Sequence, residues 1–269
     1  MSYAPVNGLD MYYEIHGAGD PVVLLHGALS GVGTSFGPMV PLLARTRQVI
    51  AVEFQAHGHT ADIDRPLSIA QLAEDTVALL RHLGIEHADV FGYSMGAEVA
   101  LHLVTEHPEV VRKAVLASVA YDLGGLHPGS LDGIGEVRPE HLFGTPFHTE
   151  YLEVAPRPED FPTLVAKVTD LDRRLPEWPA DAIRAITTPT LLIAGDADLI
   201  RPEHVVEMFR LLGGGVNGDL TDLPPVRLAV LPGTSHIGVT HRPDWVASMV
   251  DDFLGPGDPA SYCHGSNSR

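Results

Sequence analysis

A serine near the middle of the chain lies in a pattern that favours nucleophilic chemistry. The pentapeptide Gly92-Tyr93-Ser94-Met95-Gly96 follows an apolar run of β type at 88–91 and precedes a helical pattern at 97–107. A sharp strand-to-helix turn holds a serine hydroxyl out at the end of its strand, and the flanking glycines keep side chains from colliding there. Ser94 is therefore a candidate nucleophile, although the pentapeptide alone also fits a glycine-flanked serine in an ordinary loop.

A serine hydroxyl is a weak nucleophile near neutral pH, so a base must accept its proton and a third group must orient that base. Two later apolar runs end in suitable residues. The run at 190–194 leads into Gly195-Asp196-Ala197-Asp198, and the run at 228–231 leads to Thr234-Ser235-His236. The order Ser, Asp, His, with each residue at the end of a strand, predicts a nucleophile, an acid and a base.

Two further motifs occur at strand ends, His26-Gly27 after the run 22–25 and Ala56-His57-Gly58-His59-Thr60 after 49–54. With the serine pentapeptide and the Asp…His tail, the chain resembles the α/β-hydrolase superfamily over residues 5 to 254.

The resemblance implies a triad of Ser94, Asp198 and His236, with Asp196 as the alternative acid that more readily caps its loop. It also implies an oxyanion hole formed by the backbone N–H groups of Ala28 and Met95.

The chain departs from the family pattern at three positions. Ala56 and Ser235 replace usual glycines, and Ala97 occupies a position where a second glycine is common. Small residues replace small ones, so we expect shifted loops with the chemistry intact.

Hydrophobic periodicity predicts an α/β fold, with a mostly parallel central sheet and helices on both faces. We expect residues 1–121 and 187–254 to form the core, 122–186 a small cap insertion, and 255–269 a disordered tail. A hairpin is predicted at 6–9, and further elements follow in alternation. The predicted strands are 10–16, 21–25, 48–54, 88–91, 111–117, 190–194 and 227–231, and the predicted helices are 69–83, 97–107, 203–212 and 244–254.

The stretch 122–186 interrupts this alternation, and the resemblance implies that it covers the active site. Residues 164–171 predict an amphipathic helix whose inner face could contact substrate. The alternative, that these apolar side chains only attach the cap to the core, stays open. Together they predict a modest apolar pocket. Its candidate residues are His26, Leu29, Leu142, Phe143, Phe147, Leu164, Val168 and Ile237.

The composition limits the choice of partners. Seventeen basic and 35 acidic residues give a formal charge of −18, which argues against nucleic acid and anionic membranes as partners. The single cysteine, Cys263, excludes an intrachain disulfide and a CxxC motif. We find no export signal and no apolar run of membrane-spanning length, and so expect a cytoplasmic protein. Residues 213–225 predict a flexible surface loop.

Fifteen histidines raise the question of a metal site. The run from His57 to Asp62 partly matches H-x-H-x-D-H, but its Asp comes one residue late and the last His is missing; H-E-x-x-H does not occur. We therefore expect no metal and no cofactor. Glu98, in the first turn of the helix after Ser94, is expected to complement the helix dipole.

These observations predict a serine hydrolase that cleaves a small, largely apolar carboxylic ester or lactone through an acyl-enzyme. A small-molecule substrate is the expected partner, and a homo-oligomeric assembly is left open. The alternatives on the same triad are a cofactor-free perhydrolase or haloperoxidase, a C–C bond hydrolase and a thioesterase. A non-catalytic ligand-binding module is a further alternative, because fold and triad do not encode the substrate.

Overall fold

The computed structural model describes residues 2–130, 132–133 and 136–255, and the predicted disordered tail lies outside them apart from Gly255. Its sheet has the strand order β1-β2-β4-β3-β5-β6-β7-β8. Only β1 and β2 run antiparallel to their neighbours. The strands are β1 (Ser2–Val6), β2 (Leu9–His16), β3 (Pro21–Leu25), β4 (Gln48–Val52), β5 (Ala88–Tyr93), β6 (Val111–Ala117), β7 (Thr190–Ala197) and β8 (Val226–Ser235).

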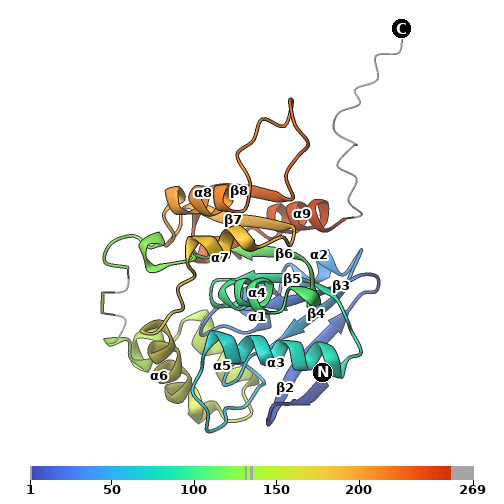
Figure 1. Ribbon diagram of the computed structural model, residues 1–269. Coiled ribbons are helices and arrows are strands. Elements are labelled where there is room, and N and C mark those ends of the chain that lie inside the picture. Colours follow the sequence, from blue (N-terminus) through green and yellow to red (C-terminus); the bar gives the residue numbers. More distant parts are fainter. Residues whose placement is uncertain (1, 131, 134–135, 256–269) are drawn as a thin grey trace.

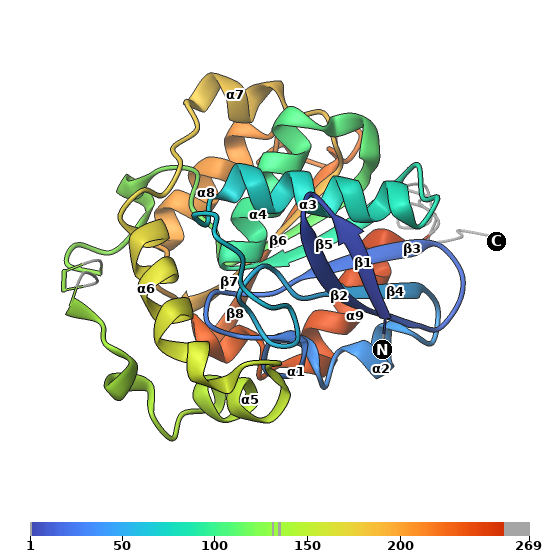
Figure 2. The same cartoon turned by 90° about the horizontal axis from the view of Figure 1, so that it is seen from below.

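Helices cover both faces of this sheet, as predicted. One buried cluster joins side chains of α3, α4 and α8, and a second joins those of α1, α2 and α9. Figure 2 shows α3 and α4 on one side of the strands and α1, α2 and α9 on the other. The helices are α1 (Val32–Phe36), α2 (Val40–Leu43), α3 (Ile69–His82), α4 (Met95–Glu106), α5 (Pro146–Val154), α6 (Phe161–Asp172), α7 (Ala180–Ala185), α8 (Pro202–Leu211) and α9 (Pro243–Leu254).

Local sequence explains the main elements. Every residue of β5 is buried, as expected for a parallel strand that is covered on both faces. The β1–β2 hairpin turns through Asn7 and Gly8, whose φ values of 49° and 82° fit the left-handed conformation that a two-residue hairpin requires. The helix α3 begins after Ser68, whose hydroxyl accepts a hydrogen bond from the Gln71 N–H at 3.2 Å. The α/β prediction is confirmed.

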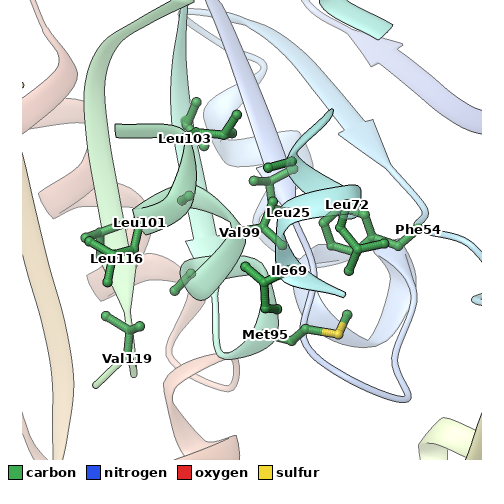
Figure 3. Packing of buried hydrophobic residues seen from close by; sticks show 14 of the residues in the cluster. Leu25, Phe54, Ile69, Leu72, Met95, Val99, Leu101, Leu103, Leu116 and Val119 are labelled. Carbon is green, nitrogen blue, oxygen red and sulfur yellow. The ribbon is translucent and has the colours of Figure 1, made fainter. Parts of the chain in front are cut away.

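The first half of α4 is fixed by the larger buried cluster. Val99 and Met95 of α4 belong to the same buried cluster as Leu25 of β3 and Ile69 of α3, and Figure 3 labels these residues. Val99 is fully buried, and Met95 is 5% exposed. The turn that precedes α4 therefore rests on close-packed side chains, which hold its position with little freedom.

A long insertion, residues 118–189, separates β6 from β7, and the predicted cap falls within it (Figure 1). The Lys167 ammonium of α6 donates to Asp62 Oδ1 at 2.7 Å and to the Ile63 carbonyl at 2.8 Å. The Glu150 carboxylate of α5 accepts from the N–H groups of Gly31 and Thr34, each at 3.0 Å. The helices α5 and α6 of the insertion are thus tied to segments that follow β3 and β4.

Between α8 and β8 the chain forms a projecting surface loop, drawn in orange in Figure 1, over the residues where we predicted one. Leu220 in this loop is 81% exposed. None of the helices in the described part of the chain combines the length and the apolar composition that crossing a bilayer requires.

Candidate active site

Ser94 lies at the turn between β5 and α4 in a backbone conformation that few non-glycine residues adopt. Its φ and ψ are 53° and −121°, and its N–H donates to the Ala117 carbonyl at 2.9 Å. A Cβ atom on Gly96 would lie 2.0 Å from the Leu25 carbonyl oxygen, and one on Gly92 would lie 2.1 Å from the Gly96 carbonyl oxygen. The two glycines therefore permit the close backbone approach that this strained turn needs.

Three side chains that are far apart in sequence meet at the carboxyl edge of the sheet. His236 Nε2 lies 2.9 Å from Ser94 Oγ, and His236 Nδ1 lies 2.7 Å from Asp198 Oδ1. The imidazole thus bridges a hydroxyl and a carboxylate at hydrogen-bonding distances. The Tyr93 hydroxyl donates to the His236 carbonyl at 3.1 Å, which ties the histidine loop to the strand that precedes Ser94.

Asp198 is 4% exposed, and several donors surround its carboxylate. Oδ2 accepts from Ser118 Oγ at 2.6 Å and from the Gly195 N–H at 3.2 Å, while the Ile200 N–H lies 3.3 Å from Oδ1. Burial raises the pKa of Asp198, but the hydrogen bonds from His236 and Ser118 outweigh it and hold the pKa below the ordinary value. The carboxylate is therefore ionised and ready to orient His236.

Asp196, the alternative acid, does not take part in this contact. Its Oδ1 accepts from the Thr234 N–H at 3.0 Å, so it joins the loops after β7 and β8. Hydrogen bonds from the backbone N–H groups of Gly233 and Thr234 lower its pKa. Ser118, which binds Asp198, was missed by the sequence analysis. Its position directly after β6, at the same sheet edge as Ser94, is the signal that could have identified it.

Ala28 and Met95 both line the cavity next to Ser94. Neither of their backbone N–H groups finds a hydrogen-bond acceptor within the described residues. Two free N–H groups beside a serine hydroxyl and a helix N-terminus form a site suited to a developing negative charge. The structure thus brings the two predicted oxyanion donors to the same cavity.

Two buried histidines shape the loop that carries Ala28. His26 Nε2 accepts from the Phe54 N–H at 3.1 Å, and its Nδ1 lies 2.8 Å from the Gly27 carbonyl. His57 Nε2 accepts from the Leu29 N–H at 3.2 Å. Burial lowers the pKa of His26 well below its ordinary value and that of His57 to about 4, so both rings are neutral.

The histidine pattern that suggested a metal is used for protein contacts. His59 Nδ1 lies 2.8 Å from the Glu53 carboxylate, while His57 holds the loop at Leu29. Within residues 2–130, 132–133 and 136–255, no group of three or more His, Cys, Asp or Glu side chains is arranged to hold a metal ion.

The cavity beside Ser94 has a volume of about 190 Å³. Its walls come from the triad region, from the start of the insertion, from the end of α6 and from the residues that follow β7. The lining residues are Ala28, Ser94, Met95, Glu98, Ser118, Ala120, Asp122, Leu123, Leu126, Ser130, Asp172, Leu175, Pro176, Leu199, Ile200 and His236.

The predicted pocket set requires correction, because none of its eight residues lines this cavity. Leu164 and Val168 are 1% and 3% exposed and belong to the large core cluster. Phe143 and Ile237 are about half exposed. His26 is buried in the loop contact described above, Leu29 and Leu142 pack against the core, and Phe147 is partly buried. The apolar face of α6 is used for packing, and only the end of that helix reaches the cavity.

Two acidic side chains in the cavity were also not anticipated as site residues. Glu98 is one helical turn beyond Ser94, and its Oε2 atom is buried without a hydrogen-bond partner in the described structure. Burial raises the pKa of Glu98 to about 8, with the negative charge of Asp172 adding to the effect. Burial also raises the pKa of Asp172, the last residue of α6, to about 6. The prediction that Glu98 complements the helix dipole did not include the burial of its carboxyl group in the cavity.

The chain is similar to known hydrolases. The family model of the alpha/beta hydrolase fold matches residues 20–145. The protein named "Putative carbamate hydrolase RutD" from Azorhizobium caulinodans is 26% identical over 95% of this chain and 98% of its own length. The 2-hydroxymuconate semialdehyde hydrolase of Pseudomonas sp. (strain CF600) is 28% identical over 91% of this chain and 90% of its own length.

A solved structure shares the fold. The meta-cleavage product hydrolase of Pseudomonas fluorescens IP01 superposes with a TM-score of 0.76 at 18% identity, and the match covers 94% of this chain and 97% of that one. At this level of identity the likeness shows that the two chains share a fold.

Proposed function

The chain belongs to the α/β-hydrolase superfamily and is a hydrolase, and we propose that it is a serine hydrolase that cleaves a small carboxylic ester or lactone through an acyl-enzyme. The observation that carries this proposal is the continuous contact from Ser94 Oγ through the His236 imidazole to the Asp198 carboxylate. The three groups have the roles and distances of a nucleophile, a general base and an orienting acid.

In the proposed reaction the Ser94 oxygen attacks the acyl carbonyl while His236 Nε2 accepts the hydroxyl proton. The Asp198 carboxylate stabilises the imidazolium, and the N–H groups of Ala28 and Met95 receive the negative charge on the carbonyl oxygen. His236 then protonates the leaving alcohol. The same imidazole next takes a proton from a water molecule, whose oxygen attacks the acyl carbon. As the bond between Ser94 Oγ and the acyl carbon breaks, His236 returns this proton to Oγ, and the acid product is released.

The size of the cavity favours short substrates. Since a cavity of roughly 150 Å³ holds benzene, a volume of about 190 Å³ suits an acyl group of only a few carbon atoms. Apolar residues such as Leu126 and Ile200 line the same cavity as Ser94 and His236. This lining supports a compact, mainly apolar acyl chain.

The test is a profile of kcat/KM for p-nitrophenyl esters from acetate to octanoate, with Ser94→Ala as the control. We expect the highest values for short chains and a loss of roughly 10⁴–10⁶ in kcat for the variant. A fluorophosphonate probe should label the parent protein and leave Ser94→Ala unlabelled. Turnover that survives in Ser94→Ala, or the absence of both ester hydrolysis and labelling, would rule the proposal out.

A second candidate is hydrolysis of a C–C bond, which the similarity to the 2-hydroxymuconate semialdehyde hydrolase supports. The same triad could serve it, because an acyl carbonyl is again the electrophile. Decay of the absorbance of 2-hydroxymuconate semialdehyde on addition of the protein, absent with Ser94→Ala, would favour this candidate over the ester hydrolase.

A further inference from the structure

The cavity beside Ser94 is acidic, in addition to being small and partly apolar. Glu98, Asp122 and Asp172 all line it, and His236 is the one basic side chain among the described lining residues, which include no lysine or arginine. Because the pKa of Asp172 is about 6, its carboxylate is ionised at pH 7 and would repel a substrate that carries a carboxylate close to its acyl carbonyl.

Glu98 is positioned for contact with a substrate at Ser94. Ser94 is the residue that precedes α4, Glu98 lies in the first turn of that helix, and both residues line the same cavity. The Glu98 N–H donates to the Ser94 carbonyl at 3.1 Å, which fixes this helical spacing. A group attached to the acyl chain of a substrate bound at Ser94 would therefore share this cavity with the Glu98 carboxyl group.

One oxygen of the Glu98 carboxyl group also lacks a hydrogen-bond partner among the described residues. This oxygen, Oε2, is shielded from solvent, and no described residue donates to it. Buried carboxyl oxygens in folded proteins are otherwise nearly always hydrogen-bonded. A ligand that brings a donor into the cavity would supply the missing partner, and a cationic donor would also favour ionisation of both Glu98 and Asp172.

We propose that this cavity binds a substrate bearing an ammonium group close to its scissile carbonyl, with Glu98 and Asp172 as the residues that recognise the cation. This inference rests on the proposed hydrolase function for its substrate, and it adds a charge preference that the triad does not determine. A tight, desolvated contact between an ammonium group and a carboxylate is stronger than the same contact in water.

The experiment compares esters that differ only in charge. The p-nitrophenyl esters of 3-aminopropanoate and butanoate have acyl groups of the same shape, and 2-(dimethylamino)ethyl acetate and 3-methylbutyl acetate form a matching pair on the alcohol side. At pH 7 we expect kcat/KM to be at least tenfold higher for the cationic ester in one of the two pairs. The p-nitrophenyl ester of succinate should be a poorer substrate than the butanoate ester.

Variants assign the preference to the cavity. Glu98→Gln and Asp172→Asn should each reduce the ratio of cationic to neutral kcat/KM about tenfold, while Glu153→Gln, on the exposed side of α5, should leave the ratio unchanged. A ratio of one or less in both pairs, with the neutral esters cleaved in a Ser94-dependent way, would overturn the charge preference and leave the hydrolase function standing.

A binding measurement separates the two proposals when no ester is cleaved. Calorimetric titration of Ser94→Ala with n-propylammonium, propanol and propanoate reports the charge preference without turnover. Saturable binding of propylammonium that is weakened by Glu98→Gln would support the cation site even if the ester hydrolase proposal fails. Equal or undetectable binding of all three compounds would overturn the cation site.

Discussion

At the scale of single residues, the two aspartates after β7 have different surroundings and should respond differently to the same substitution. Asp198→Asn removes the charge that stabilises the His236 imidazolium, and its amide can place a donor where His236 Nδ1–H needs an acceptor. We expect kcat for the best ester substrate to fall about 10⁴-fold. Stopped assays at saturating substrate would measure this loss.

Asp196→Asn is the matched control for that prediction. The Asn side chain can still accept from the Thr234 N–H, so kcat should change less than about tenfold. If Asp196→Asn were the more damaging substitution, the assignment of the acid would have to be reversed.

The meeting of Ser94, Asp198 and His236 could be predicted because each follows a strand, and parallel strands end at one edge of the sheet. Sequence reasoning did not identify the pocket. The cavity walls come from segments whose pairing in space leaves no local pattern, such as Leu126 and Ile200, which form an isolated bridge between the insertion and the loop after β7. Apolar residues such as Leu164 were equally consistent with core packing, and packing is where the structure places them.

At the scale of elements, the β5–α4 turn should tolerate no added side-chain atom on its inner face. In Gly96→Ala the new Cβ would lie 2.0 Å from the Leu25 carbonyl oxygen, so α4 would have to move away from β3. We expect a loss of several kcal/mol in the free energy of unfolding or a failure to fold, and no measurable esterase activity. Urea denaturation and the ester assay on purified protein would measure both effects.

Gly84→Ala provides the comparison. Gly84 follows α3 with φ of 70° and open space around its Cβ position, so the substitution costs only about 1 kcal/mol of backbone strain and should leave activity intact. A Gly96→Ala protein as stable and active as Gly84→Ala would contradict the proposed close packing at the serine turn.

The order and type of most core elements could be predicted because apolar periodicity differs clearly between strands such as β5 and helices such as α3. The short helices α1 and α2 were not predicted. The structure of the insertion was harder to predict from the sequence. Its helices α5 and α6 are held by long-range contacts of Glu150 and Lys167 with loops more than 100 residues earlier in the chain, and such contacts are not encoded in local patterns.

At the scale of the whole molecule, the buried Glu98 should make global stability depend on pH. Its pKa of about 8 in the folded state exceeds the pKa of 4.5 of an ordinary glutamate, so between these pH values the folded protein keeps a proton that the unfolded chain releases. The free energy of unfolding therefore falls as pH rises through this range. At about 1.4 kcal/mol per pKa unit, the contribution amounts to a few kcal/mol.

Glu98→Gln removes this titration while keeping the size of the side chain. We expect the loss of stability between pH 5 and pH 8 to be a few kcal/mol smaller in the variant than in the parent protein, measured by urea denaturation at both values. Asp172, with a pKa of about 6, contributes in the same direction in both proteins and cancels in the comparison. Parallel pH profiles would show that Glu98 ionises without penalty in the folded state.

The donors that surround Asp198 also affect the rate of proton transfer from Ser94 to His236 in the proposed reaction. Ser118 follows β6, whereas Gly195 and Ile200 lie in and just after β7, and all three hydrogen bonds are present in the resting protein. When the neighbouring imidazole becomes positively charged during the proposed reaction, these dipoles already have the orientation that the ion pair requires. The reorganisation energy of the step is therefore low, because folding has already oriented these dipoles and they need not reorient in each catalytic cycle.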